Sequence, residues 1–181
     1  MRRLAALMAG HADDPLWKKF SAQFLSVLGE RGWRVGDNLV IEARWADGDG
    51  ALFERYASEL VALAPDVIFC QTSPALAALL RATRTIPIVF ARVTDPVGQG
   101  FVRSLAAPGG NVTGFADYDP PLAGRWLSML SQLSPRVTRT TALYNPATAP
   151  YAGMMLRTLA TVAPTFGMTL HTATIEQASE I

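Results

Sequence analysis

The sequence has very little of the material from which disulfides and metal centres are built. Its 181 residues include one cysteine, Cys70, and two histidines. A single cysteine forms no intramolecular disulfide, and we expect this one to be a buried thiol because it ends an apolar run. His11 and His171 lie far apart and lack cysteine or carboxylate partners at ligand spacing. No metal site and no cofactor are therefore predicted.

Charge is also sparse and evenly spread. Sixteen basic and fifteen acidic residues leave a net charge of +1, and no basic run is longer than Arg2-Arg3 or Lys18-Lys19. Nucleic-acid binding needs clustered basic side chains, so no nucleic-acid partner is predicted. No apolar run approaches the roughly 20 residues of a membrane span, so we expect no membrane insertion. The opening MRRLAALMAG has no convincing cleavage site for an export signal, and we interpret it as a strand.

Enzyme signatures are missing as well. There is no G-x-x-x-x-G-K, no G-x-G-x-x-G after the first strand and no G-x-S-x-G. Asp13 and Asp14 with Asp95 would suit a phospho-acceptor pocket, but a basic partner on a last strand is missing and the layout has two lobes. We predict that the chain is not an enzyme.

The sequence does contain short apolar runs that alternate with helical patterns, and 50% of its residues are hydrophobic. Alternation of strands and helices predicts a parallel sheet with right-handed crossovers. The second run alternates apolar and charged residues, which indicates a strand near a sheet edge. The predicted strands are Leu4–Met8, Asn38–Trp45, Asp66–Cys70, Ile86–Val93, Val112–Phe115, Thr140–Tyr144 and Met168–Ile175.

Two lobes follow from this pattern. Residues 1–115 form a complete N-terminal α/β lobe, and residues 116–181 form the start of a second α/β lobe that is incomplete. The stretch ADYDPP, residues 116–121, is proline-stiffened and acidic, and we interpret it as the crossover between lobes. The helix that follows carries Trp126 at core spacing, so we expect that side chain to be packed.

The ligand crevice of an open parallel sheet lies beyond the carboxyl ends of its strands. That rule selects four polar loops, residues 10–14, 71–73, 94–96 and 145–151. Ser73 with Pro74 opens a helix whose free N–H groups would suit a carboxylate, although Ser73 is equally well interpreted as only a cap. Asp95 is the best partner for a ligand ammonium, with ordinary turn chemistry as the alternative. Asp13 fits a solvated loop better than a site.

Several stretches together resemble one known family. They are ELVALAPDVIFCQTSPALAALLRATRTIPIVFARVTDPVGQGFVRSLAAPGGNVTGF, WLSMLSQLSPRV and ALYNPATAPYAG. The string DPVGQGFV…PGGNVTG is similar to that of ABC-transporter substrate-binding proteins, the family that includes tryptophan and tyrosine binders. The resemblance covers almost the whole chain. It implies the type I periplasmic-binding-protein fold, with the first lobe complete and the second partial, and a first hinge crossing at residues 115–119.

The resemblance also implies a function. It predicts the solute-binding component of an ABC importer, which holds a small amino-acid-like solute, with aromatic amino acids as candidates, between two lobes by hinge closure. An ABC permease and ATPase are the implied partners, and the implied location is periplasmic or lipoprotein-anchored, although no export signal is recognised in this chain. Members run well beyond residue 181, so a fragment is expected. The predicted ligand-binding residues are Gly10, Asp13, Thr72, Ser73, Thr94, Asp95, Asn145 and Tyr151.

Two alternatives remain open at this point. One is a ligand-sensing domain of a signalling protein on the same fold, since fold does not fix function. The other is a non-functional fragment, for which an uncovered sheet would cause poor solubility.

Overall fold

Five apolar runs form one sheet in the order β2-β1-β3-β4-β5. β1 pairs in parallel with β2 and β3, and β3 pairs in parallel with β4. The prediction of a parallel sheet is therefore confirmed, as is the edge position of the second strand. The strands are β1 (Arg2–Met8), β2 (Leu39–Trp45), β3 (Val67–Gln71), β4 (Ile88–Thr94) and β5 (Val112–Tyr118).

The computed structural model describes residues 1–118, 122–146, 148–149 and 151–175. The chain divides into two units, unit 1 (Met1–Ala116) and unit 2 (Asp117–Ile181), each of which is described by itself. The predicted hinge segment, residues 115–119, is described only as far as Tyr118, the last residue of β5. Most strands match their predicted ranges to within a residue or two, and β5 runs three residues further than predicted.

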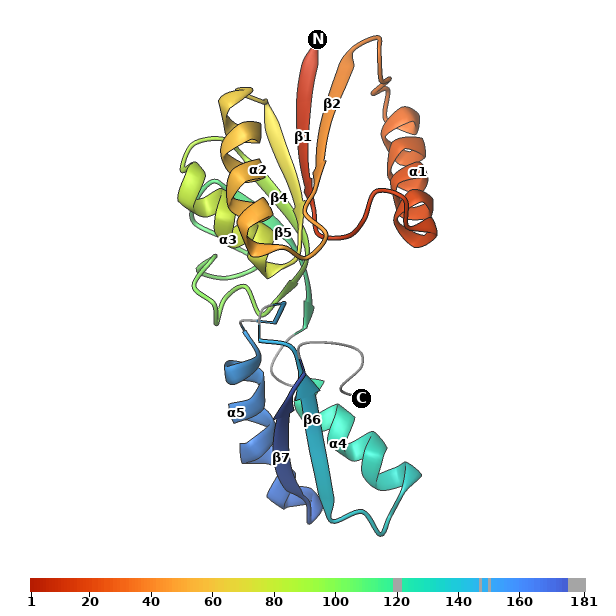
Figure 1. Cartoon of the computed structure of the whole chain (residues 1–181), viewed down its shortest axis with the longest axis vertical. Helices are drawn as coiled ribbons and strands as arrows, with labels where there is room; N and C mark the ends of the chain where they lie inside the picture. Colours follow the sequence, from red (N-terminus) through yellow and green to blue (C-terminus); the bar gives the residue numbers. More distant parts are fainter. Residues whose placement is uncertain (119–121, 147, 150, 176–181) are drawn as a thin grey trace. The chain divides into compact units, whose positions relative to one another are not determined.

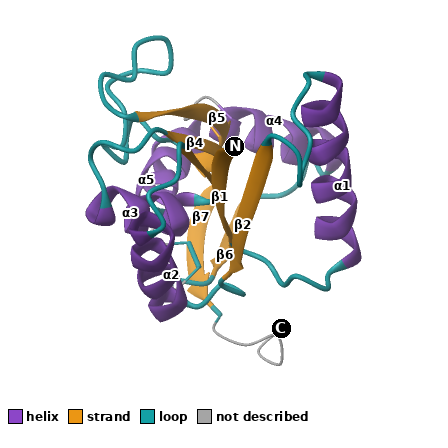
Figure 2. Cartoon of the chain, turned by 90° about the horizontal axis from the view of Figure 1, so that it is seen from above, coloured by secondary structure: helices purple, strands orange, loops and turns teal. Residues whose placement is uncertain are grey.

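Helices cover the two faces of the sheet in unit 1. α2 (Gly50–Ala62) and α3 (Ser73–Ala82) lie side by side on one face, and α1 (Pro15–Glu30) lies on the other (Figures 1 and 2). The core fills the space under α2 and α3, because strand residues of alternate position point there. Leu7, Ile68, Leu79 and Phe90 are each 0% exposed.

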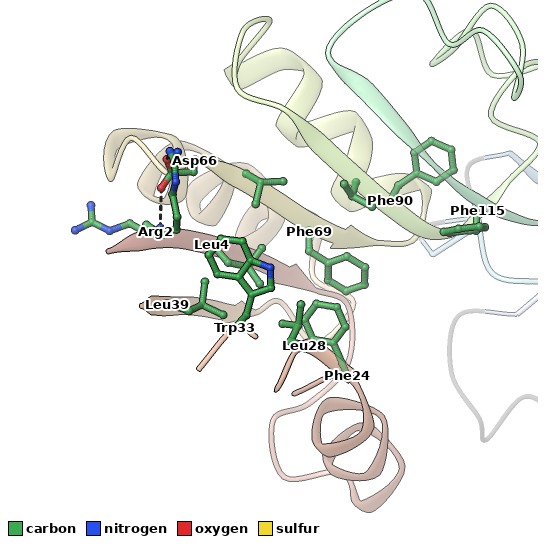
Figure 3. A pocket seen from close by; sticks show the side chains of 13 residues that line it. Arg2, Leu4, Phe24, Leu28, Trp33, Leu39, Asp66, Phe69, Phe90 and Phe115 are labelled. Carbon is green, nitrogen blue, oxygen red and sulfur yellow. Dashed lines mark hydrogen bonds and ion pairs between the residues drawn. The ribbon is translucent and has the colours of Figure 1, made fainter. Parts of the chain in front are cut away.

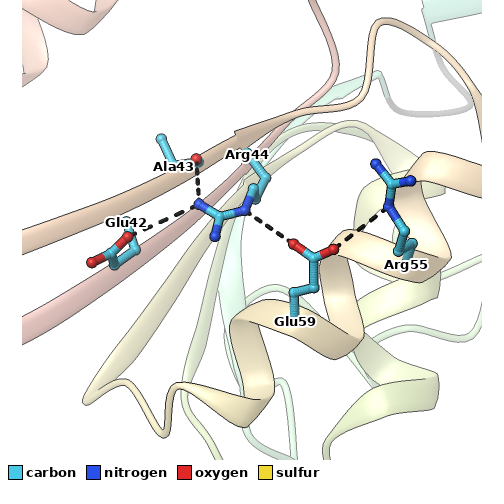
Figure 4. Close-up of polar contacts among 5 residues, drawn as sticks. All are labelled: Glu42, Ala43, Arg44, Arg55 and Glu59. Carbon is cyan, nitrogen blue, oxygen red and sulfur yellow. Dashed lines mark hydrogen bonds and ion pairs between the residues drawn. The ribbon is translucent and has the colours of Figure 1, made fainter.

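A network of ion pairs connects α2 to the edge strand β2 (Figure 4). The Arg44 guanidinium donates from Nε to Glu59 of α2 at 3.2 Å and from a second nitrogen to the Ala43 carbonyl at 3.1 Å. Arg55 reaches Glu59 from the other side at 3.5 Å, and Glu42 lies 3.9 Å from Arg44. These groups are partly exposed, so each pair contributes only about 0–1 kcal/mol and mainly fixes the register of α2 on β2.

Unit 2 contains a two-stranded parallel sheet, β6 (Arg139–Tyr144) and β7 (Thr169–Thr174). Its helices are α4 (Leu122–Leu133), α5 (Ala152–Val162) and the 3₁₀ segment η1 (Ala163–Phe166). A small apolar cluster joins α4, α5 and η1, with Leu127, Leu159 and Met168 among its buried members. Trp126 is 41% exposed, so the expectation that it is packed was wrong. Its neighbour Leu127 and Ala123 are the residues of α4 that are buried in the cluster.

Candidate functional site

The loops singled out in unit 1 follow the carboxyl ends of adjacent strands. Strand order reverses at β1, since β2 lies on one side of it and β3 on the other, and ligand crevices in open α/β sheets form at such a point. Pairing of Leu7 with Cys70 and of Gln71 with Ala91 puts the ends of β1, β3 and β4 at one edge. The structure therefore brings the six predicted residues of unit 1 to the same edge.

Thr72, directly after β3, has an unusual backbone conformation. Its φ is 74° and its ψ is 156°, a region that is essentially restricted to glycine. Its hydroxyl oxygen is buried and has no hydrogen-bond partner in the described part of the chain. The residue is held in place by its own N–H, which donates to the Ala91 carbonyl at 3.2 Å. Strain of this kind collects at ligand sites, where the surrounding fold over-determines the backbone.

Ser73 is only 1% exposed and belongs to α3 as its first residue, so it is not the cap that the sequence suggested. The cap position is Thr72, whose side chain makes no capping hydrogen bond. The Ser73 hydroxyl instead accepts a hydrogen bond from the Gln99 side-chain amide at 2.9 Å. The same amide also donates to the Thr94 carbonyl. Gln99, which sequence reasoning missed, therefore joins the loops after β3 and β4.

Asp95 shapes the loop after β4. Its φ is 38°, it is 8% exposed, and its carboxylate accepts a hydrogen bond from the Gly98 N–H at 2.9 Å. Its carbonyl accepts from the Gln99 N–H at 3.0 Å, which closes the turn. Thr94 is 6% exposed. Asp95 thus shows the turn chemistry named as its alternative reading, while its role toward a ligand stays a prediction.

The loop after β1 contributes both a close contact and a solvated ion pair. Gly10 lies against the indole of Trp17, so that a Cβ at this position would collide with the ring. Asp13 is exposed and pairs with Lys18 at 2.9 Å, and this hydrogen bond and charge lower the pKa of the Asp13 carboxyl. Asp14 caps α1 by accepting from the Leu16 N–H at 2.7 Å. Each aspartate therefore has a local structural use.

The guanidinium of Arg92 in β4 lies over the Trp17 ring, 5.2 Å from its centroid. The φ of Arg92 is 55°, so three of the five described non-glycine residues with positive φ, Thr72, Arg92 and Asp95, lie at the ends of β3 and β4. Sequence reasoning missed both Trp17 and Arg92 as residues of this edge, because arginine does not favour a positive φ and no sequence pattern marks the contact between the two side chains.

In unit 2, Asn145 follows β6 and Tyr151 precedes α5, so both lie in one loop. The Asn145 side-chain oxygen accepts from the Thr148 N–H at 3.3 Å, and its carbonyl accepts from the Ala149 N–H at 2.9 Å. Tyr151 is half-buried at the cap position of α5, where it makes no side-chain capping bond. Their contact with a ligand stays a prediction.

A large apolar cavity lies elsewhere, between α1 and the sheet (Figure 3). It has a volume of about 690 Å³ and is walled by apolar side chains, among them Phe24, Phe69 and Phe115. No residue of α1 is buried, and its contact with the sheet includes the Phe24 ring stacked on Phe69 with centroids 5.3 Å apart. Its charged lining residues, Arg2, Arg3 and Asp66, bond to one another at one end, and its other lining side chains are apolar, so we place the candidate site at the strand ends.

Asp66 closes one end of that groove (Figure 3). The backbone N–H of Arg3 donates to its carboxylate at 2.7 Å, and the Arg2 side chain pairs with its other oxygen. These two hydrogen bonds lower the pKa of Asp66.

Other kinds of chemistry find no support at this edge. The prediction of a buried thiol is confirmed for Cys70, and burial raises the pKa of this thiol. Among the described residues, no three His, Cys, Asp or Glu side chains come together as metal ligands would. In the same part of the chain, no helix is long and apolar enough to cross a membrane.

Comparison with known proteins gives one consistent result. A family model described as ABC transporter substrate binding protein matches residues 13–181. A tyrosine-binding protein of Clostridioides difficile is 34% identical over 133 residues, which are 74% of this chain and 38% of that protein.

Several solved structures are similar to this chain over nearly its whole length, among them two that each cover 99% of it. A conserved domain protein from Vibrio cholerae is 31% identical with a TM-score of 0.85, and an ABC domain from Streptococcus pneumoniae in complex with L-Trp is 26% identical with a TM-score of 0.84. The chain spans 59% of the length of each. A leucine-binding protein from Thermotoga maritima, 10% identical with a TM-score of 0.71, shares the fold. The predicted type I periplasmic-binding-protein fold is thereby confirmed, as is the resemblance to this family.

Proposed function

Since the chain belongs to the family of ABC transporter substrate-binding proteins, we propose that it binds a small amino-acid-like solute for an ABC importer, with aromatic amino acids as the first candidates. The names of its relatives support this choice, because one is a tyrosine binder and another was solved with L-Trp. The chain acts as a binding protein without catalysis, in the periplasm or on a lipid anchor, and passes its solute to the permease and ATPase subunits.

Thr72 is the observation that carries the proposal. A strained residue with a buried, unpartnered hydroxyl stands where the strand order reverses, next to the first turn of α3. A bound solute would supply the missing acceptor or donor. An unsatisfied buried polar group costs about 1–3 kcal/mol, and binding would recover part of this cost.

Hinge closure is the proposed mechanism. Unit 1 offers Gly10, Thr72 and the loop after β4, and unit 2 offers Asn145 and Tyr151. If the solute contacts both units, the closed state gains contacts that the open state lacks, and the solute shifts the population toward closure. Tyr151 supplies the aromatic surface for the side chain of the solute.

Calorimetry and thermal unfolding with L-tryptophan, L-tyrosine, L-phenylalanine and L-leucine test the proposal. A solute that binds only the folded state stabilises it by about 2.7 kcal/mol at a concentration of 100 Kd. We expect Thr72→Val and Tyr151→Ala each to weaken binding about tenfold or more, and Thr113→Val, on an exposed strand position outside the site, to leave it unchanged. A folded chain that responds to none of the four amino acids at millimolar concentration contradicts the proposal.

A further inference from the structure

Arg92 is a cation at the carboxyl edge of the sheet, and it forms no ion pair with the acidic residues that the structure describes. Ion pairs in the described part of the chain involve other basic residues, and no carboxylate there lies within ion-pair distance of Arg92. The side chain is exposed. Its charge is therefore available to a bound anion.

An irregularity in the backbone of β4 determines the direction of the Arg92 side chain. Phe90 and Val93 are both 0% exposed and both face the core, although strand alternation puts residues three apart on opposite faces. The positive φ of Arg92, 55°, marks the irregularity that resolves this conflict. Such irregularities in a strand change the direction of a side chain and are common next to functional sites. A positive φ is also sterically unfavourable for arginine. Here the result is an arginine turned away from the core.

The Arg92 guanidinium lies over the Trp17 indole, which in turn lies against Gly10. The indole packs directly on Gly10, where a Cβ would occupy the space of the ring. Arg92 lies over the same indole at 5.2 Å from its centroid. A guanidinium that stacks by its face keeps the N–H donors at its rim available, and these donors match the two oxygens of a carboxylate. Gly10, Trp17 and Arg92 thus form a preorganised stack.

Thr72, directly after the neighbouring strand β3, lies beside Arg92. Gln71 pairs with Ala91, and the Thr72 N–H donates to the Ala91 carbonyl, so Thr72 and Arg92 are neighbours across β3 and β4. A group bound at Arg92 would therefore be within the same loop cluster as the unpartnered Thr72 hydroxyl.

We propose that Arg92, held on Trp17 over Gly10, is the residue of unit 1 that binds the carboxylate of the solute and so restricts the site to carboxylate-bearing molecules. This inference rests on the proposed function, since it concerns the same site. It explains why the arginine lies over an indole, is exposed and has no ion-pair partner among the described residues, and why Gly10 carries no side chain.

The test compares acids with their amides. We expect Arg92→Gln to weaken L-tryptophan or L-tyrosine binding ten- to hundredfold in calorimetry and to change the affinity for the corresponding amino-acid amide less than threefold. Arg55→Gln is the matched control, because Arg55 lies 4.7 Å from the Tyr56 ring centroid on α2, away from the site. An equal loss for acid and amide would mean that Arg92 only supports the fold and would overturn the proposal.

A second readout does not depend on amino-acid binding. The Nε–H signal of Arg92, assigned by its loss in Arg92→Lys, is followed by NMR while 3-phenylpropanoate, a carboxylate without an ammonium group, is added. We expect this signal to shift with saturation while that of Arg55 stays in place. If the chain binds no amino acid, the proposed function fails and this titration decides the inference alone. An Arg92 signal that does not move overturns it.

Discussion

Replacing Thr72 with glycine should make unit 1 more stable. Relief of the strain at φ 74° contributes about 1–3 kcal/mol, and removal of a buried hydroxyl without a partner contributes roughly 1 kcal/mol more. The greater backbone entropy of glycine in the unfolded chain costs about 1 kcal/mol. The free energy of unfolding should therefore rise by about 1–3 kcal/mol in Thr72→Gly.

Cys70 provides an assay specific to unit 1. It is the single cysteine of the chain and is 0% exposed in the core of that unit, so a thiol reagent reacts with it only when unit 1 opens. Labelling rates across a urea series then give the opening free energy without any signal from unit 2.

Two further substitutions separate the causes. Thr72→Ala removes the hydroxyl but keeps a Cβ at positive φ, so it should raise the free energy of unfolding by only about 1 kcal/mol. Thr113→Gly, on the exposed side of β5, should lower it by about 1 kcal/mol because that backbone is ordinary strand. If Thr72→Gly labels as fast as Thr113→Gly, the strain at Thr72 is not real in solution.

Three further predictions concern other parts of unit 1. Gly10→Ala should displace the Trp17 indole, shift the tryptophan emission and weaken solute binding about tenfold, and an unchanged spectrum would contradict the contact. Phe115→Asp, at a 78% exposed position, should change the free energy of unfolding by less than about 0.5 kcal/mol but reduce binding of a hydrophobic dye to the groove, whereas Leu133→Asp in unit 2 should leave the groove signal in place. Asp66, whose pKa is lowered in the folded state, contributes stability that is complete above about pH 4 and is lost as the pH falls below that value, so the urea midpoints of wild type and Asp66→Asn should converge at low pH.

Much of unit 1 could be predicted because its signals are local. The run Val67–Cys70 of β3 is apolar, as is typical of an inner parallel strand, and helix starts are marked by residues such as Asp14 and Asp49, whose carboxylates accept from first-turn N–H groups. The edge character of β2 was visible in its alternating charges. The carboxyl-edge rule then selected the loops without knowledge of any side-chain contact.

The contacts within those loops could not be predicted in the same way. The sequence suggested Ser73 as a helix cap or a ligand contact, but the structure buries its side chain, and the hydroxyl bonds to Gln99, a residue 26 positions away. Positive φ is normally marked by glycine or asparagine, so threonine and arginine gave no warning at Thr72 and Arg92. The spacing of apolar residues in α1 predicts a helix with one apolar side, but it does not predict that no residue of this helix is buried. Spacing identifies the apolar side of a helix and does not show how closely that side packs on the sheet.

The position of β1 in the sheet affects how the chain is made. β1 leaves the ribosome before β2 and β3, yet it lies between them in the sheet, and β3 is complete only at Gln71. At roughly 5–20 residues per second, synthesis of the intervening segment takes about 3–13 s. During that interval the strand Leu4–Met8, fully apolar and later buried, is exposed on the nascent chain and is a natural binding segment for holdase chaperones. Slower translation between these two strands would lengthen this exposure and lower the yield of folded protein, even though no residue of the final structure has changed.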